Sequence, residues 1–299
     1  MARAAHCLLF GRPPPTYCRQ AIRRCVTAQT QELILGNVSA WTQENSRRHT
    51  QAMKRLQFQH DGLTLSYLDS GGDGRTLVAL HAHWMEGSTY APLAAELAPE
   101  WRVIALDQRG HGHSDDALSH TRNDYFGDMA ALFAHLGLED AVVLENSLGG
   151  VNAYQFAARH PEQVSALIIE DVGVEESGGG MDFVLAWQGN FATREELAER
   201  VGPRYLAYLQ QSFRQTPGGW KLAFDPRDMV VSQSHVKGDH WADWLTTHCP
   251  ALLIRGLEAR SRCQLTSSRR PRGVPRRAFG PRTADTSFTL TTRRASPKR

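Results

Sequence analysis

The sequence predicts an α/β protein with a mostly parallel sheet and helices on both faces. Between residues 53 and 256, short apolar runs alternate with helical patterns across short connections, an order typical of parallel strands joined by helices. A chain of 299 residues with 41% hydrophobic content is long enough to bury one large core. Because no apolar run approaches the ~18 residues of a membrane-spanning helix, we expect no membrane association.

The elements follow from the apolar patterns. Residues 56–59 and 63–68 alternate apolar and polar side chains on either side of the Asp61-Gly62 turn and predict a hairpin. Short apolar runs predict further strands at 77–80, 103–106, 141–144, 166–169 and 251–254. Helical patterns lie at 91–97, 129–136 and 148–159. Residues 172–247 predict a helical, aromatic-rich cap inserted between the sixth and seventh strands, with a capping box at Thr193 and Glu196.

Charge divides the chain into three parts. Residues 1–54 carry eight Lys or Arg against two acids, and residues 257–299 carry twelve against two, whereas the part between them is acidic. Neither end has a sustained apolar period, so we expect disordered extensions over 1–52 and 257–299 around a domain at 53–256. The Arg-rich ends predict incidental binding of polyanions, without specific recognition of a nucleic acid.

Cysteine usage indicates neither a disulfide scaffold nor a metal site. The five cysteines are an odd number, and no two pairs of them have metal-ligand spacing. We therefore expect no metal, no cofactor and a reducing, cytoplasmic setting. The oligomeric state is left open.

Ser147 is the strongest candidate for chemistry. It stands between a strand that ends at Leu144 and a helix that begins near Leu148, and Gly149-Gly150 follows it. A sharp strand-to-helix turn lifts a serine oxygen out of the sheet and leaves the next backbone N–H free to bind an oxyanion. The alternative interpretation is a serine that only caps the helix.

Other polar residues end neighbouring strands. His83 follows the strand at 77–80, where a second backbone N–H for an oxyanion is needed. Asp171 follows the strand at 166–169 and is either a catalytic acid or a loop cap. Asp107 and Arg109 follow the strand at 103–106, and we expect them to form a structural pair.

Three stretches together resemble the α/β-hydrolase fold family, in particular its small serine esterases. They are Leu80-His81-Ala82-His83, the loop of residues 107–114 with its Asp-x-Arg-Gly-x-Gly-x-Ser pattern, and Asn146-Ser147-Leu148-Gly149-Gly150. The resemblance covers residues from about 53 to 256. It implies an eight-stranded, mostly parallel sheet, a helical cap and a Ser-Asp/Glu-His triad.

The resemblance also implies roles for single residues. Ser147 would be the nucleophile, Leu148 and His83 would supply oxyanion-hole N–H groups, and Asp171 would be the acid. The expected activity is that of a serine hydrolase, which cleaves small ester or acyl substrates through an acyl-enzyme without a cofactor.

The sequence departs from the family pattern at several positions. Glu145 and Ala82 replace glycines of the pattern, which predicts strain, a carboxylate near the nucleophile and a shifted His83 N–H. No histidine follows His248, so the last strand, the last helix and the base are expected to be missing. His240 lies in the cap, where we expect a helix residue rather than the base.

These departures support two further hypotheses. One is that the reading frame has shifted near Gly256, which the gene's nucleotides would test. The other is an inactive, degenerate hydrolase-fold protein.

Overall fold

The structure is a computed structural model that describes residues 5–10, 53–170, 172–176 and 180–256. Its main sheet has eight strands. In chain order they are β1 (Ala5–Phe10), β2 (Lys54–His60), β3 (Leu63–Asp69), β4 (Arg75–Leu80), β5 (Trp101–Leu106), β6 (Ala141–Asn146), β7 (Val164–Glu170) and β12 (Ala251–Gly256). The spatial order is β1-β12-β7-β6-β4-β5-β3-β2.

The centre of the sheet is parallel and its edges are antiparallel. Strands β12, β7, β6, β4 and β5 pair in parallel, whereas β2–β3, β3–β5 and β1–β12 are antiparallel pairs. The fold class, the hairpin and every strand predicted between residues 53 and 256 are therefore confirmed. Because parallel strands share a direction, β4, β5, β6 and β7 bring their carboxyl ends to one edge.

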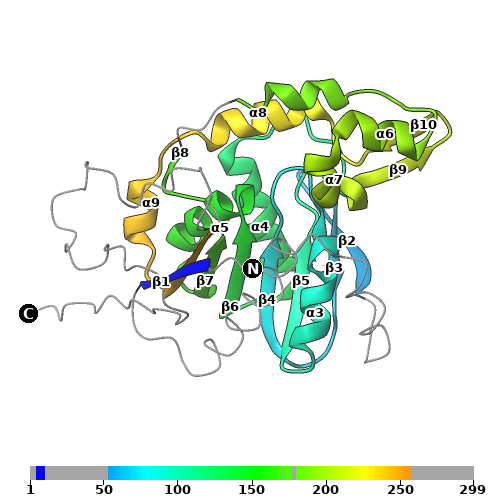
Figure 1. Cartoon of the computed structure of the whole chain (residues 1–299). Helices are drawn as coiled ribbons and strands as arrows, with labels where there is room; N and C mark the ends of the chain where they lie inside the picture. The colour runs from blue at the N-terminus through cyan, green and yellow to red at the C-terminus, as the bar shows by residue number, and fades with distance from the viewer. Residues whose placement is uncertain (1–4, 11–52, 171, 177–179, 257–299) are drawn as a thin grey trace, which may run out of the picture.

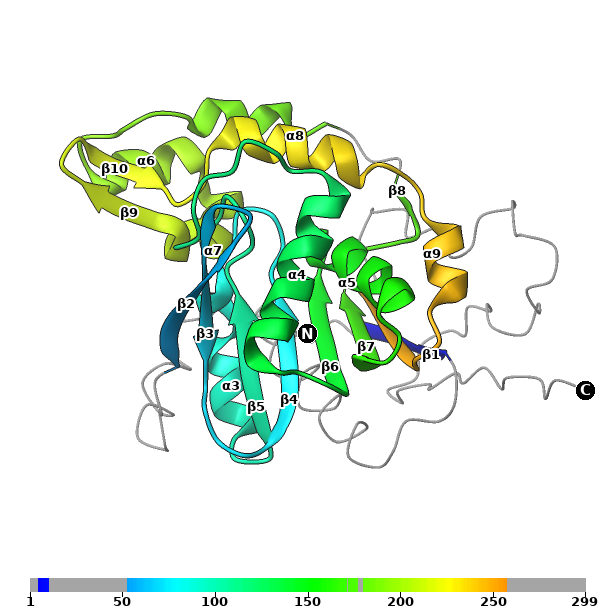
Figure 2. The ribbon, with the colours of Figure 1, turned by 180° about the vertical axis from the view of Figure 1, so that it is seen from behind.

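Helices cover both faces of the sheet. α3 (Ala91–Leu97) follows the 3₁₀ turn η1 (Gly87–Tyr90) and packs on one face, against Leu77, Ala79 and Val103. α4 (Arg122–Leu136), α5 (Leu148–Arg159) and α9 (Trp241–Thr246) pack on the other. In Figures 1 and 2, α4 and α5 lie side by side and α9 lies beside α5.

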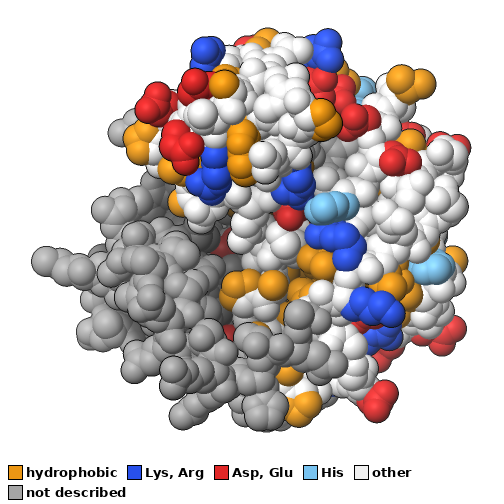
Figure 3. Space-filling model, turned by 90° about the vertical axis from the view of Figure 1, so that its right-hand side faces the viewer, with side chains coloured by type: hydrophobic (Ala, Val, Ile, Leu, Met, Phe, Trp, Pro, Cys, Tyr) orange, Lys and Arg blue, Asp and Glu red, His pale blue; other side chains and the backbone are white. Residues whose placement is uncertain are grey.

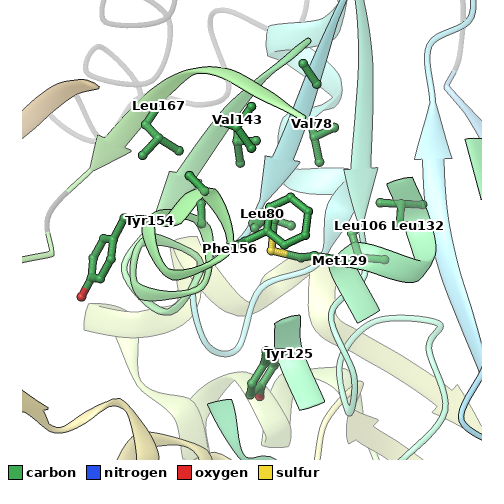
Figure 4. Packing of buried hydrophobic residues seen from close by; sticks show 14 of the residues in the cluster. Val78, Leu80, Leu106, Tyr125, Met129, Leu132, Val143, Tyr154, Phe156 and Leu167 are labelled. Atoms are coloured by element: carbon green, nitrogen blue, oxygen red, sulfur yellow. The ribbon is translucent and has the colours of Figure 1, made fainter. Parts of the chain in front are cut away.

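The larger core lies between the sheet and helices α4 and α5. Figure 4 shows side chains of β4, β5, β6 and β7 facing those of the two helices, and every one of them is buried. Met129 and Phe156 are 1% and 0% exposed, which makes this layer the main hydrophobic support of the sheet edge where β6 ends.

Residues 172–247, called the insertion below, separate β7 from β12. The elements before α9 are β8 (Glu175–Glu176), η2 (Asp182–Trp187), α6 (Arg194–Val201), α7 (Pro203–Leu209), η3 (Gln210–Ser212), β9 (Phe213–Thr216), β10 (Gly219–Leu222), α8 (Pro226–Val236) and β11 (Gly238–Asp239). Most of them lie together at the top of Figure 1 and share a cluster of buried side chains that includes Val184, Trp187, Leu197 and Met229.

The insertion is less helical than its sequence predicts. β9 and β10 form a hairpin, and Phe191 bridges to Trp220 beside it. The capping box is also incomplete, because the Glu196 carboxylate accepts from the backbone N–H of Ala192 rather than from that of Thr193. Acidic and basic side chains are mixed over the insertion on the face seen at the top of Figure 3.

Strand β1 covers the edge of the sheet beside β12. We expected disorder throughout residues 1–52 and no strand beyond the seventh, but Ala5–Phe10 pairs with β12 in antiparallel register, with Cys7 opposite Ile254. The apolar run in this segment lines up with the edge that β12 would otherwise leave unpaired. The expectation of disorder is wrong for these six residues. The rest of 1–52, apart from this strand, and all of 257–299 lie outside the described residues.

Within the described ranges, no helix is long and apolar enough to cross a lipid bilayer. The same ranges contain no cluster of three His, Cys, Asp or Glu side chains that would hold a metal ion.

Candidate active site

Ser147 occupies a strained turn between β6 and α5. Its backbone has φ 52° and ψ −105°, a left-handed conformation that side chains other than glycine rarely adopt. Its N–H donates to the Glu170 carbonyl at the end of β7 (3.0 Å). A Cβ at Gly149 would lie 2.6 Å from the Leu80 carbonyl oxygen, so only glycine allows the helix to start this close to β4.

The turn places Ser147 at the start of α5. Leu148 is the first residue of the helix and is 1% exposed. The first N–H groups of a helix have no partner inside it and carry the positive end of its dipole. The Leu148 N–H therefore suits a negative charge that develops beside Ser147.

His83 leaves the same edge of the sheet. β4 pairs with β6 in parallel, with Leu80 opposite Glu145, so the loop after β4 and the turn after β6 begin side by side. Ala82 is absent from the positive-φ residues of this loop, and Trp84 (φ 73°) supplies the left-handed conformation instead. The shift of the His83 N–H is expected only if position 82 uses positive φ, and this condition is not met.

Four buried histidines, called the histidine group below, surround this loop: His81, His83, His111 and His120. Burial lowers the pKa of each of them, and the other histidines of the group lower it further in His83 and His111. His81 donates from Nδ1 to the Ala82 carbonyl (2.8 Å) and accepts the Gln108 N–H at Nε2 (3.0 Å). Its neutral form is thus fixed by two backbone groups.

Unlike His81, His111 has a hydrogen-bond partner at only one of its two ring nitrogens. Its Nδ1 donates to the Arg109 carbonyl (2.9 Å), whereas its buried Nε2 has no partner among the described residues. The ring centroids of His111 and His81 lie 5.0 Å apart, and Phe224 of the insertion lies 6.2 Å from His111 on another side. The histidine group therefore lies where the sheet edge meets the insertion.

Glu145 fits beneath α5 without displacing the turn. One carboxyl oxygen accepts the Ala153 N–H at 3.3 Å, and a Cβ on Gly150 would come within 3.4 Å of the other oxygen. The small residues at positions 150 and 153 thus make room for the side chain. Burial raises the pKa of Glu145 well above its ordinary value and favours the neutral acid. The predicted opposition of its charge to an oxyanion is therefore removed.

A second buried set, called the Arg122 group below, links α4 to α5 and α9. The Arg122 guanidinium donates to Asn152 Oδ1 and to Gln155 Oε1 (3.1 Å for the second bond). Asn152 in turn donates to Gln108 Oε1, and Gln155 donates to Asp243 (2.7 Å). Burial lowers the pKa of Arg122 to about 10, so the side chain keeps its charge at neutral pH.

Comparison with known proteins agrees with this geometry. Residues 76–217 match a family model described as alpha/beta hydrolase fold. The part of the chain that is described therefore has the α/β-hydrolase fold. It is 33% identical over 202 residues to a non-heme chloroperoxidase of Streptomyces lividans, a match over 62% of this chain and 65% of the relative.

Further relatives carry hydrolase names. A 2-(acetamidomethylene)succinate hydrolase of Mesorhizobium japonicum is 33% identical over 101 residues, which are 33% of this chain and 36% of that protein. The crystal structure of E-2-(acetamidomethylene)succinate hydrolase aligns with a TM-score of 0.61 at 22% identity over 67% of this chain and 79% of the other. Each of the two curated relatives is matched over less than two thirds of its own length.

The loop after β5 is held in place by ion pairs and hydrogen bonds. Arg109 forms a two-bond ion pair with Asp128 of α4 (2.7 Å for each bond), whereas Asp107 pairs with Arg55 and accepts the Gly87 N–H (2.6 Å). The predicted pairing of Asp107 with Arg109 is therefore wrong, although both residues are structural. Their partners come from elements that the local pattern does not show.

Among the described residues, no base lies within hydrogen-bond distance of Ser147. In the part of the chain that is described, the Ser147 hydroxyl has no hydrogen-bond partner. His240 is 8% exposed at the start of α9, donates from Nε2 to the Val236 carbonyl (2.8 Å) and lies 3.3 Å from Gln155 at Nδ1. Its interpretation as a helix residue is consistent with these contacts. Asp171 lies outside the described residues.

Sequence reasoning missed the residues that connect α4 to the site. Tyr125 and Ser232 are buried, and Arg122 is half-buried, at the junction of α4 with α5 and α8. A signal for Arg122 existed, because Thr121 and Asp124 form a complete capping box that starts α4 at this residue. No local pattern shows that the Arg122 side chain bonds to α5.

Proposed function

We propose that this chain is a serine hydrolase that acts on small ester or acyl substrates, with Ser147 as its nucleophile. The observation that carries the proposal is the left-handed turn at Ser147 between β6 and α5. Such strain persists only where the surrounding structure maintains it, and it is concentrated at functional sites. A helix-capping serine needs no such turn, and no side-chain cap bond forms at Ser147.

The reaction would proceed through an acyl-enzyme. Ser147 Oγ attacks the substrate carbonyl carbon, and the carbonyl oxygen takes the negative charge of the tetrahedral intermediate. The backbone N–H groups of Leu148 and His83 stabilise this oxygen, the leaving group departs with a proton, and water then releases the acid. We expect no metal or cofactor in these steps.

Asp171 is proposed to orient the base that receives the Ser147 proton. The insertion is proposed to act as the cap over the substrate. Contacts between the insertion and the loop after β4 support this placement, since Ser212 Oγ donates to the Trp84 carbonyl and Arg214 pairs with Glu86. The aromatic side chains around Trp84 favour an apolar acyl or aryl group. The use of cysteine supports a reducing, cytoplasmic setting.

A second candidate is a hydrolase-fold protein without catalysis. It is favoured by the lack of a hydrogen-bonded base at Ser147 within the described residues. A serine hydroxyl is a weak nucleophile unless a base takes its proton. Polyanion binding by the basic ends would then be an incidental property.

Labelling with a fluorophosphonate distinguishes these candidates, because the reagent reports an activated serine without requiring the natural substrate. We expect the full chain to take one label and the Ser147→Ala variant to take none. Ser234→Ala, at an exposed serine of α8, should label like the unchanged chain. No label on a sample that melts cooperatively would reject catalysis and support the second candidate.

A further inference from the structure

A chain of three buried polar side chains joins α4, α8 and the loop after β4. His83 Nε2 lies 2.9 Å from Ser232 Oγ, and Ser232 Oγ lies 2.8 Å from Tyr125 Oη. Tyr125 and His83 are each 2% exposed, and Ser232 is fully buried. The three residues are far apart in sequence, so the contact depends on the insertion resting on the sheet edge.

The protonation states of the end residues decide which atoms donate in these two hydrogen bonds. Burial, with Arg122 and neighbouring histidines, lowers the pKa of His83 to about 3, and burial raises the pKa of Tyr125 to about 12. Both side chains are therefore neutral at pH 7, and the imidazole carries a single N–H. If Tyr125 donates to Ser232 and Ser232 donates to Nε2, each hydroxyl hydrogen has an acceptor.

The reverse direction is less favourable. His83 Nε2–H would donate to Ser232, and Ser232 would donate to Tyr125. The Tyr125 hydroxyl hydrogen would then have no acceptor among the described residues, and His83 Nδ1 would keep a bare lone pair. Leaving buried polar groups unpaired is unfavourable, because they lose their bonds to water without replacing them. The favoured direction therefore places the imidazole proton on Nδ1.

In this tautomer, the Nδ1–H of His83 is a buried hydrogen-bond donor. Nδ1 has no hydrogen-bond partner in the described ranges. The residue stands three positions beyond Leu80, and Ser147 stands two positions beyond Glu145, the residue that pairs with Leu80. The unpaired donor and the candidate nucleophile thus belong to adjoining segments at one edge of the sheet.

We propose that the His83 Nδ1–H binds an acceptor oxygen in the acyl part of the substrate, and that Ser232 and Tyr125 are positioning residues that hold the imidazole in this tautomer. The proposal rests on the proposed function, to which it adds a specificity-determining side chain. A substrate with a carbonyl or carboxylate oxygen in its acyl part would satisfy the donor, whereas a purely aliphatic acyl chain would leave it unpaired. The rival occupant is a buried water molecule.

Nitrogen NMR of the histidine-labelled full chain tests the tautomer. We expect His83, assigned with a His83→Gln variant, to carry its proton on Nδ1 at pH 7. Ser232→Ala should leave a mixture of tautomers, Ser232→Thr should restore the Nδ1–H form because it keeps the hydroxyl, and Ser234→Ala should change nothing. A proton on Nε2 in the unchanged chain would overturn the inference.

Titration with succinamide, an unreactive diamide with a second carbonyl oxygen in its acyl part, tests the binding site in the Ser147→Ala chain. Butyramide, whose acyl chain is purely aliphatic, is the matched control. With succinamide we expect a saturable shift of the His83 Nδ1–H signal, with affinity reduced about tenfold by Ser232→Ala, the effect of losing one ~1.4 kcal/mol interaction. An unshifted signal with succinamide would mean that only water occupies the site and would reject the proposal.

Because Ser147→Ala lacks the nucleophile, the binding titration does not depend on catalysis. The two measurements therefore test the His83 binding site and the serine hydrolase independently. A succinamide shift without fluorophosphonate labelling of the unchanged chain would remove the hydrolase and keep the binding site. Labelling without a succinamide shift would keep the hydrolase and remove the role of His83.

Discussion

Burial lowers the pKa of the histidine group and of Arg122 in the same direction, but only Arg122 keeps its proton at neutral pH. The histidines face one another and backbone carbonyls, so burial drives them to the neutral form. Arg122 faces the amide oxygens of Asn152 and Gln155, and it remains charged. The comparison shows that the ordinary pKa of a base decides whether the same lowering removes its proton, because that pKa is 6.5 for His and 12.5 for Arg.

Removing the charge from the Arg122 group should have the largest effect. Arg122→Met leaves the side-chain oxygens of Asn152 and Gln155 without their donor, and we expect a loss of about 2–4 kcal/mol in the free energy of unfolding, from two unpaired acceptors. Urea denaturation measures it. Arg194→Met, at the exposed first residue of α6, is the matched control and should cost about 0.5 kcal/mol or less. Equal losses in the two variants would show that Arg122 is not buried among partners.

Acid should destabilise the protein through the histidine group. Below about pH 6.5 the histidines of the unfolded chain bind protons, whereas those of the folded chain stay neutral because their pKa values are lowered. The free energy of unfolding therefore falls as the pH falls below that value. Each fully suppressed histidine contributes about 1.4 kcal/mol per pH unit.

The matched test is His111→Asn, which keeps a donor for the Arg109 carbonyl and should make the slope between pH 4.5 and 6.5 shallower. The exposed His248→Asn is its control. Denaturant titrations at several pH values give the slopes, and an unchanged slope in His111→Asn would contradict a neutral histidine group.

Glu145 should give a smaller effect of opposite sign. Its pKa is raised in the folded chain, so the stability that it contributes is present below about pH 4.5 and is lost as the pH rises. Glu145→Gln imitates the neutral acid and removes this loss, and we expect a gain of about 1–3 kcal/mol at pH 8. Thermal melts at pH 5 and pH 8 test it. A destabilised variant at pH 8 would mean that the carboxylate is charged and paired.

The patterns that depend on neighbours in sequence predicted well. Apolar runs located β4 to β7 and β12, and Ser147 with its two following glycines located the turn, because a buried strand and a tight strand-to-helix connection each impose local composition. The insertion predicted less well. Its β9–β10 hairpin is short, and the aromatic residues around it fit a helix or a strand equally.

The sequence by itself determined the sheet, the helices that cover it and the position of Ser147. Only the tertiary structure decided that Arg109 pairs with Asp128, that Ala5–Phe10 pairs with β12, and that α8 brings Ser232 to His83. The physical reason is that each of these contacts joins distant segments. Local propensity reports what a segment buries, whereas the partner of a buried polar group depends on which segment folds against it.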